Sequence, residues 1–286
     1  MLSARGITRF GLNQDGIGRC SIRVPSFSQQ VAIAQKLDEE TRRIDDLIAE
    51  KSSFIALLRE KRVAAISHLV RRGNGACLVD TGIEWRGLAP SSWQRSKLKA
   101  LFQQVKRQGY ENLTVLSVYR DYGVIEKSSR DDNINKTPEN LANYQLVEPG
   151  DLVINKMKAW QGSMGISQYR GITSPDYVVM KPRYKTNPRY LHHYLRARPM
   201  PWVYRQISNG IRTDQWRLEP ERFLDLPIFL PPMEEQADIA DRIDRETTRI
   251  DGLIYETERS INLLTEKRAA LITAAVTGKI DVRSVA

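Results

Sequence analysis

The sequence predicts an α+β protein in which one mixed α/β domain is flanked by two long helices that pair as an antiparallel coiled coil. Residues 25–73 and 231–279 align at a constant offset of 206, and 22 of the 49 positions are identical, so the chain contains an internal repeat. The residues between the copies form short β-branched segments bounded by Gly, Pro, Asn or Asp, a pattern typical of strands. We expect a short N-terminal segment (1–24), a first long helix (25–73), a middle domain (74–230), and a second long helix with a C-terminal tail (231–286).

Both copies carry an a/d heptad seam, which indicates a coiled coil. The clearest match is Arg43-Ile44-Asp45, which recurs as Arg249-Ile250-Asp251. A helix of about 45 residues would be roughly 67 Å long and cannot bury its apolar stripe alone, so each copy is expected to pack against the other. The expected seam positions are 37, 41, 44, 48, 51, 55, 58, 62, 65 and 69, and their equivalents 243–275, with polar interruptions at Lys51, Arg62 and Arg268.

Heptads alone would also fit a generic coiled coil with no role beyond dimerisation. The placement of the two copies around an inserted basic domain argues for a more specific role. If the ends of that domain lie close together, the first helix enters it and the second leaves it in the opposite direction, so the pair is antiparallel.

The charge of the chain points to a polyanionic partner. The formal net charge is +10, with 23 Lys and Arg against 15 Asp and Glu in residues 74–227 and 8 against 11 in residues 228–286. A basic middle domain favours nucleic acid as the ligand. No apolar run reaches the roughly 18 residues of a membrane span, so we expect a cytoplasmic protein with no membrane partner. The two cysteines, Cys20 and Cys77, are expected to be reduced thiols.

The middle domain is expected to hold a mixed or largely antiparallel sheet. Asn187-Pro188 is a helix start signal, and a second short helix is expected through Val203 and Ile207. The predicted strands are Leu113–Tyr119, Gly123–Lys127, Asp151–Met157, Met164–Ser167 and Asp176–Lys181.

The segment PGDLVINKMKAWQGSMG, residues 149–165, is the strongest candidate for ligand contact. It places Lys156, Lys158, Trp160 and Gln161 within six residues, next to two glycines. Lysines suit phosphate contacts, and glycines let a backbone approach closely. The alternative is a solvated strand edge followed by a tight hairpin, with Trp160 in the core.

Three parts of the chain resemble type I restriction–modification DNA specificity (S) subunits. GDLVINKMKAWQGSMGIS, followed by GITSPDYVV, resembles a target-recognition domain of that family. The run SNGIRTDQWRLEPERFLDLPIFLPPMEEQADIADRID, residues 208–244, and the ending LLTEKRAALITAAVTGKIDV, residues 263–282, resemble the adjoining conserved regions. These motifs occur in the family's order and span nearly the whole chain.

The resemblance implies half of a specificity subunit, with one recognition domain flanked by both conserved helices. The family's usual plan is two recognition domains, each followed by a conserved helix, whereas residues 1–24 here resemble only the tail of a first recognition domain. The implied function is sequence-specific binding of double-stranded DNA, reading one half of a split target. The implied partners are modification (methyltransferase) subunits, which bring S-adenosylmethionine, and a restriction/translocase subunit, which uses ATP and Mg²⁺. A homodimer and a complementing half subunit are the two assemblies that would complete the target.

This chain itself is expected to be non-catalytic and to hold no cofactor. Its three histidines, His68, His192 and His193, lack metal-ligand spacing, and no Gly-rich phosphate loop occurs. Activity from an autonomous nuclease or methyltransferase is therefore disfavoured, whereas a folded but silent specificity fragment that acts only as a coiled-coil module is the alternative function. We expect DNA contacts first from Lys156, Lys158, Trp160, Gln161, Ser174, Arg212 and Gln215, and second from Lys106, Arg107, Tyr119 and Arg120.

Overall fold

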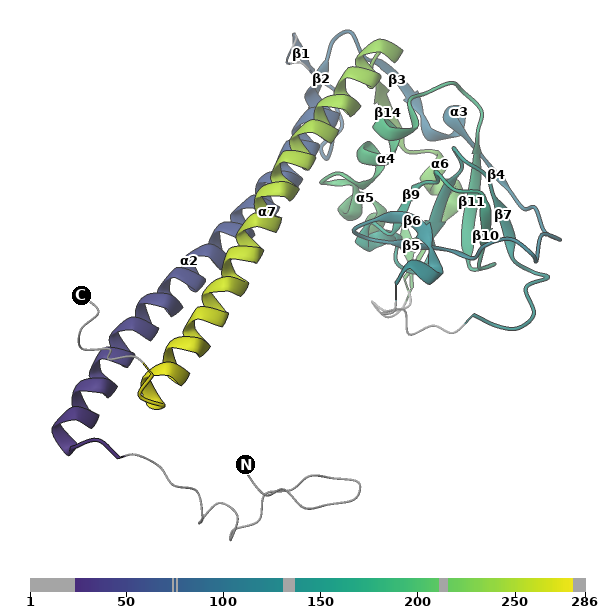
Figure 1. Ribbon diagram of the computed structural model, residues 1–286. Coiled ribbons are helices and arrows are strands. Elements are labelled where there is room, and N and C mark those ends of the chain that lie inside the picture. Colours follow the sequence, from purple (N-terminus) through teal and green to yellow (C-terminus); the bar gives the residue numbers. More distant parts are fainter. Residues whose placement is uncertain (1–23, 74, 76, 131–136, 211–215, 280–286) are drawn as a thin grey trace. The chain divides into compact units, whose positions relative to one another are not determined.

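The computed structural model describes residues 24–73, 75, 77–130, 137–210 and 216–279. The chain divides into two compact units, a helical unit (residues 1–55 and 255–286) and a mixed unit (residues 56–254). The boundary between the units passes through the two long helices, α2 (Phe27–Arg72) and α7 (Met233–Val276). Figure 1 shows the elements and their order along the chain.

The two long helices begin and end close to the predicted positions. Helix α2 starts after Pro25 with a reciprocal cap, in which the Ser26 amide donates to Gln29 Oε1 at 3.1 Å and the Gln29 amide donates to Ser26 Oγ at 3.4 Å. Such a capping box satisfies two amides that the first turn leaves without helical partners. The predicted seam is confirmed, because every seam position in both helices is buried or partly buried.

The helices pair antiparallel, as predicted, and lie side by side in each unit (Figure 1). In the mixed unit Arg62 Nε lies 2.9 Å from Asp251 Oδ1, and in the helical unit Arg268 Nε lies 2.8 Å from Asp45 Oδ1. The numbers of the paired residues rise on one helix as they fall on the other, which is the signature of antiparallel packing. Within their own units, Ile44 and Ile250 are almost fully buried on these seams.

A four-stranded antiparallel sheet forms the centre of the mixed unit. Its strand order is β4-β11-β8-β9, with β4 (Phe102–Val105), β8 (Leu152–Asn155), β9 (Met164–Ile166) and β11 (Tyr177–Pro182). Val179 is paired with Val105 on one side and with Val153 on the other. Consecutive residues are buried in the inner strands, Leu152–Ile154 in β8 and Val178–Met180 in β11, so both faces of the sheet are covered there, in keeping with the Val and Ile content.

Smaller antiparallel pairs and short helices surround this sheet. The pairs are β1 (Leu78–Asp80) with β2 (Leu88–Pro90), β3 (Gln94–Lys97) with β14 (Pro227–Leu230), β5 (Leu116–Tyr119) with β6 (Gly123–Glu126), β7 (Gln145–Val147) with β10 (Gly171–Thr173), and β12 (Ser208–Asn209) with β13 (Arg217–Leu218). The short helices are α3 (Leu98–Leu101), η1 (Lys127–Ser129), η2 (Ala159–Gln161), α4 (Pro188–Arg196), α5 (Met200–Gln206) and α6 (Pro220–Leu224).

The five predicted strands and both predicted short helices are present, with ends that differ by up to three residues. Asn187 caps α4 through its side chain, which accepts from the Arg189 and Tyr190 amides, as the Asn-Pro signal predicts. The sequence did not predict the strands β1–β4, β7, β10 and β12–β14. Most of them are two to four residues long, too short to establish a period-two pattern.

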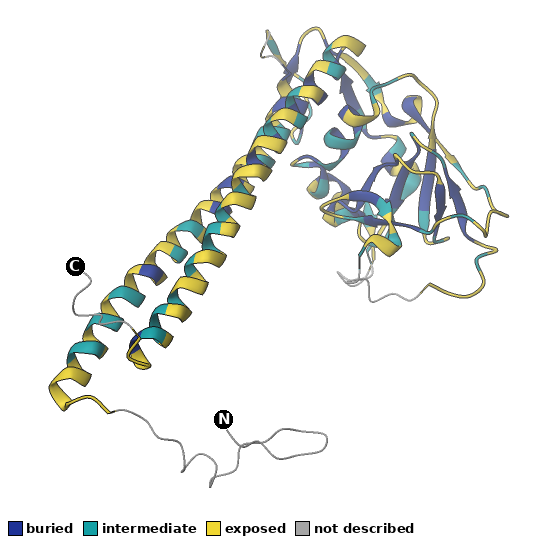
Figure 2. Cartoon of the chain, in the orientation of Figure 1, coloured by how far each residue is buried: buried dark blue, intermediate teal, exposed yellow. Residues whose placement is uncertain are grey.

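The α7 helix forms part of the core of the mixed unit. Ile239, Ala240 and Ile243 are completely buried in the same hydrophobic cluster as Trp93 and Tyr190 of the middle domain. The Tyr190 hydroxyl also donates to the Val70 carbonyl of α2 at 3.2 Å. Figure 2 shows the buried strands in dark blue and the exposed outer faces of the helices in yellow. The middle domain is thus packed onto both helices by apolar burial.

No helix in the described part of the chain is both long and apolar enough to cross a membrane.

Candidate nucleic-acid interface

One open concavity of about 860 Å³ lies in the mixed unit beside the β5–β6 hairpin. Four chain segments form its wall: the hairpin with the residues after it, the stretch before β7, the β8–η2 region, and the turn between β10 and β11. Because these segments come from distant parts of the sequence, only the folded domain creates the surface. We call this concavity the reading pocket, and its polar lining includes Tyr119, Arg120, Tyr122, Lys127, Arg130, Asn140, Asn143, Tyr144, Asn155, Lys158, Gln161, Ser174 and Tyr177.

The lining of the reading pocket is cationic and rich in groups that can read bases. Four cations line it against two carboxylates, Asp121 and Asp176. Each carboxylate lies near an arginine, since Arg120 Nε is 3.2 Å from Asp121 and Arg217 Nη2 is 3.9 Å from Asp176. Cations suit phosphates, and carboxamides can pair with the edges of bases.

Aromatic rings make up much of the remaining lining. The Arg130 guanidinium lies over Tyr122, 4.8 Å from its ring centroid, and over Tyr119 at 5.4 Å. Among the described residues, the buried Tyr119 hydroxyl has no hydrogen-bond partner, which is uncommon for a buried polar atom and suits a site that a ligand completes. Burial raises the pKa of Tyr177 above its usual value, so this phenol stays protonated and can donate a hydrogen bond.

The structure brings five of the predicted DNA-contact residues together. Lys158 and Gln161 from the β8–η2 region, Ser174 from the β10–β11 turn, and Tyr119 and Arg120 from the hairpin all line the reading pocket. Lys158, Gln161 and Arg120 are exposed, as phosphate or base contact requires. Their convergence gives these five candidates a common location.

The other candidates that the structure describes lie outside the pocket lining. Trp160 is partly buried, donates from Nε1 to the Met157 carbonyl at 3.1 Å and packs edge-on against Trp216, contacts that help to hold the turn. Lys156 is partly buried, and its carbonyl accepts the Leu218 amide at 3.0 Å. Lys106 is exposed on the chain just after β4. Arg212 and Gln215 fall outside the described residues.

Arg107 is held by an internal partner. It forms an ion pair with the nearly buried Asp151 and also donates to the Leu146 carbonyl. Burial raises the pKa of Asp151, while the Glu148 amide and Arg107 act in the opposite direction. This pairing gives Arg107 a structural role, which reduces its availability for DNA.

Two features of this surface were not predicted from the sequence. Arg205 lies over the Trp216 ring, 4.6 Å from its centroid, and Trp216 contacts Trp160 at a centroid distance of 5.7 Å. Arg130 was also missed, because its cation–π contacts depend on the hairpin folding back on itself. Isolated arginines carry no local signal that distinguishes a stacked residue from a solvated one. In the described residues, no group of three or more His, Cys, Asp or Glu side chains could hold a metal ion.

A family model for the type I restriction modification DNA specificity domain matches residues 90–259. That range covers more than half of the chain and contains the whole reading pocket. The chain belongs to this family. No curated protein matches this chain.

Solved structures show the same fold for the specificity domain. The HsdS subunit from Thermoanaerobacter tengcongensis is 16% identical, with a TM-score of 0.54 over 96% of this chain and 65% of that one. A chain from a structure of type I R-M complex assembly and conformational transition is also 16% identical, with a TM-score of 0.64 over 96% and 66%. This chain therefore spans just under two thirds of the length of these chains, and at this identity the likeness shows the fold alone.

Proposed function

We propose that this chain is a specificity subunit that reads one half of a split target in double-stranded DNA through the reading pocket. The observation that carries the proposal is the convergence of Tyr119, Arg120, Lys158, Gln161 and Ser174, from three separate segments, on one cationic concavity in a DNA specificity domain. Different side chains serve different contacts. Arg120 and Lys158 bind phosphates and set the orientation of the DNA, whereas Gln161 and Ser174 contact base edges.

The proposal that this chain reads half of a target rests on the recognition domain between the two helices and on a second docking surface on the helices. In the mixed unit, the Gln236 Oε1 accepts the Asn187 amide at 2.8 Å, Asp244 accepts Arg189 at 2.5 Å, and Ile239 is fully buried. These three residues hold the recognition domain on α7. The offset of 206 gives their equivalents in the helical unit.

The equivalents are the same residue types and are more exposed. Gln30, Ile33 and Asp38 replace Gln236, Ile239 and Asp244, and Gln30 keeps the contact within its own helix, donating to the Pro25 carbonyl at 2.8 Å as Gln236 does to Pro231 at 2.9 Å. Ile33 is only partly buried, and Asp38 is exposed. We infer that this surface accepts a second recognition domain, which supplies the other half of the target.

The second recognition domain could come from a homodimer or from a separate complementing chain, and the intramolecular coiled coil favours one of these. Because α2 and α7 fill each other's seams within one chain, a homodimer built through those seams would have to open them. A complementing recognition domain needs no such opening, so we favour it. The homodimer stays a prediction.

The outer faces of the helix pair are suited to modification subunits. Leu47 and Leu263 are exposed in the helical unit, and their repeat equivalents Leu253 and Leu57 are exposed in the mixed unit. Exposed leucines recurring at matched positions favour protein contacts. On this proposal, the chain is non-catalytic and cytoplasmic, and S-adenosylmethionine, ATP and Mg²⁺ belong to the methyltransferase and restriction subunits.

Methylation mapping tests the proposal. The chain would be expressed with its cognate modification subunit, and methylated bases would be mapped across the host genome. We expect one split motif, which disappears when Lys158 and Gln161 are both replaced by alanine and persists in the control Lys185→Ala, an exposed lysine outside the reading pocket.

The alternative function, a silent fragment acting only as a coiled-coil module, predicts a different result. The modification subunit would co-purify with the chain, yet no motif would be methylated. Binding to random duplex DNA would not separate the two functions, because charge alone gives salt-sensitive affinity.

A further inference from the structure

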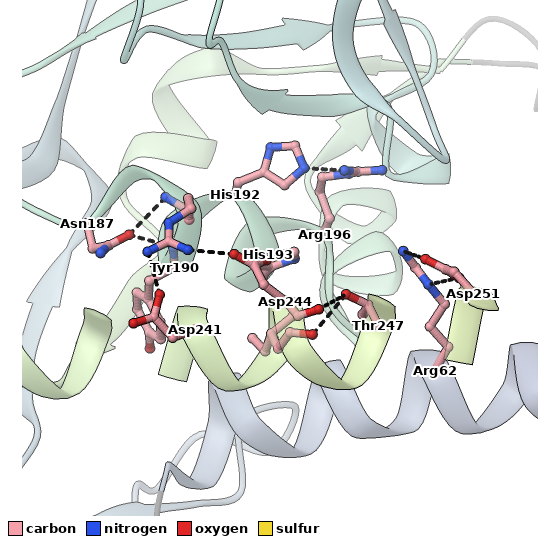
Figure 3. Close-up of polar contacts among 12 residues, drawn as sticks. Arg62, Asn187, Tyr190, His192, His193, Arg196, Asp241, Asp244, Thr247 and Asp251 are labelled. Atoms are coloured by element: carbon pink, nitrogen blue, oxygen red, sulfur yellow. Dashed lines mark hydrogen bonds and ion pairs between the residues drawn. The ribbon is translucent and has the colours of Figure 1, made fainter. Parts of the chain in front are cut away.

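Helix α4 makes polar contacts from two different faces, with His192 and Arg196 on one side and His193 on the side of Asp244 of α7 (Figure 3). Arg189 and His193, four residues apart, lie toward α7, whereas His192 and Arg196, also four apart, lie toward the β5–β6 hairpin and β9. Residues four apart share one face of a helix. The same short helix therefore contacts the recognition surface and the coiled coil.

The α7 face of the helix is held by charged contacts. Arg189 Nη2 lies 2.7 Å from Asp241 Oδ1, and its Nη1 lies 2.5 Å from Asp244 Oδ2. His193 Nε2 is 3.5 Å from the other oxygen of Asp244. A forked guanidinium bound to two carboxylates fixes direction as well as distance.

The hairpin face is held by Arg196 and His192. Arg196 donates to the Arg120 carbonyl and to His192 Nε2. A guanidinium has only donors, so His192 Nε2 must accept, and the imidazole is neutral with its proton on Nδ1. Burial, together with the positive charge of Arg196, lowers the pKa of His192 from 6.5 to about 3. The ring therefore stays neutral at neutral pH and keeps its role as an acceptor.

Two glycines let the His192 ring pack directly on the backbone of the hairpin and of β9. A Cβ added to Gly123 would lie 2.5 Å from His192 Cε1, and one added to Gly165 would lie 3.1 Å from the same atom. Gly123 also has a φ of +76°, which side-chain-bearing residues rarely adopt. The turn of the hairpin is thus in direct contact with the imidazole, and a side chain at Gly123 would collide with the ring.

The hairpin depends on such contacts for its position. In the described residues, β5 and β6 form a two-stranded sheet of their own, outside the four-stranded sheet. The start of β5 is tied to β10 by hydrogen bonds, because the Ile172 amide donates to the Thr114 carbonyl at 2.9 Å and Thr173 Oγ1 donates to the Leu116 carbonyl at 3.4 Å. Beneath the hairpin, Leu116, Val118 and Val124 pack in a small apolar cluster, and such apolar packing is non-directional at the far end, where the turn lies. The hydrogen bond from Arg196 to the Arg120 carbonyl gives the turn a fixed direction.

We propose that His192 and Arg196 are positioning residues that hold the β5–β6 turn, and with it Tyr119 and Arg120, at the reading pocket in a fixed relation to α7. The positioning role stands on the contacts of α4, whereas its effect on DNA reading rests on the proposed function. Neither residue lines the reading pocket, so their influence on DNA would act through the backbone of the hairpin.

Hydrogen exchange of the full-length chain tests the positioning role without DNA. Arg196→Met removes both donors while keeping most of the side-chain volume, and Arg198→Met is the control, because Arg198 is an exposed arginine just beyond the same helix. We expect faster amide exchange in residues 116–126 of Arg196→Met and no change in Arg198→Met. Unchanged exchange in this segment of a folded Arg196→Met chain overturns the proposal.

A second variant covers the case in which Arg196→Met does not fold. Arg196→Lys keeps the charge but offers a point donor that cannot hold both acceptors in the fork geometry. It should show faster exchange in residues 116–126 while the four-stranded sheet keeps its protection. Equal exchange in Arg196→Lys and the wild type also overturns the proposal.

The DNA arm uses a duplex that carries the motif found by methylation mapping. Loss of alignment at the turn should weaken binding of Arg196→Met by about fivefold, with a smaller effect on random duplex DNA, and Arg198→Met should bind as the wild type does. If wild-type protein yields no motif, the proposed function fails, while the exchange result still decides the positioning role. Faster exchange with unchanged discrimination between the two duplexes overturns the link to DNA reading.

Discussion

Arg268 of α7 donates two hydrogen bonds to Asp45 of α2, with Nε 2.8 Å from Oδ1 and Nη2 3.0 Å from Oδ2. The internal repeat reproduces this relationship in the mixed unit, where Arg62 donates to Asp251 at 2.9 and 3.3 Å. Both arginines occupy seam positions that interrupt the apolar heptads. Polar seam residues specify register and orientation at some cost in stability, so the two ion pairs select the antiparallel alignment.

Exchanging the charges of one pair should therefore restore what each single change removes. Asp45→Arg brings two cations together and should lower the free energy of unfolding by about 1 kcal/mol, since exposed pairs contribute little more than that. Combining it with Arg268→Asp should recover most of the loss. Urea unfolding of the four proteins gives the coupling energy, and a value near zero would show that the pair does not act as a unit.

Arg86 is expected to be a sensitive point in the core. It is 1% exposed, donates to the Leu88 carbonyl at 2.6 Å and to the Arg71 carbonyl of α2 at 2.7 Å, and lies over the Trp93 and Phe229 rings. Arg86→Met leaves these two partly buried carbonyls without their donor, at about 1–3 kcal/mol. Chemical denaturation measures the loss, and the exposed Arg183→Met is the matched control; similar stability of both variants would contradict this role.

Gly171 and Gly252 should respond to alanine in opposite ways. A Cβ on Gly171 would lie 2.5 Å from the Thr114 carbonyl oxygen and 2.7 Å from Leu116 Cγ, whereas a Cβ on Gly252 in α7 meets nothing within 4 Å. Overpacking at Gly171 should cost about 1–3 kcal/mol, and the helical Gly252→Ala should gain up to about 1 kcal/mol. Thermal unfolding tests both signs, and a stabilised Gly171→Ala would be inconsistent with this packing.

The histidine pair on α4 predicts that stability falls in acid. Burial lowers the pKa of His193 as well as that of His192, whose pKa falls from 6.5 to about 3. An imidazole with a lowered folded-state pKa contributes stability that is complete above about pH 6.5 and is lost as the pH falls toward 3. His192→Gln cannot titrate in this range, so its melting temperature should fall less than that of the wild type between pH 7.5 and 5. Equal slopes would rule out His192 as the source.

The exposed leucines of the helical unit give a test of partner docking. Leu47 is 39% exposed and Leu263 is 58% exposed, so replacing both by glutamate should leave folding intact. If this face binds the modification subunit, co-purification of that subunit should fall at least about tenfold through desolvation of the new charges. Retained binding would place the docking surface elsewhere. Glu258→Gln, elsewhere on α7, is a control for charge change.

The sequence by itself determined the long helices and the seam on each. A repeated heptad pattern is local and strongly periodic, and the start signals at Pro25 and Asn187 act within one turn, so their consequences do not depend on distant residues. The same holds for the strands with several β-branched residues in a row, such as Tyr177–Pro182. The family resemblance in separate motifs also lies in the sequence alone.

Tertiary structure decided which candidates meet. Lys158, Ser174 and Arg120 are spread over more than fifty residues of sequence and share one pocket only because β5–β6, β8 and β11 are brought together. The sequence predicts that Arg107 contacts DNA, yet in the fold Arg107 forms an ion pair with Asp151. The two faces of α4 were also invisible, because side chains such as His192 acquire their roles from the backbones they contact. Periodicity reports which face of an element is buried, but the partner on that face is a long-range contact that only the folded chain supplies.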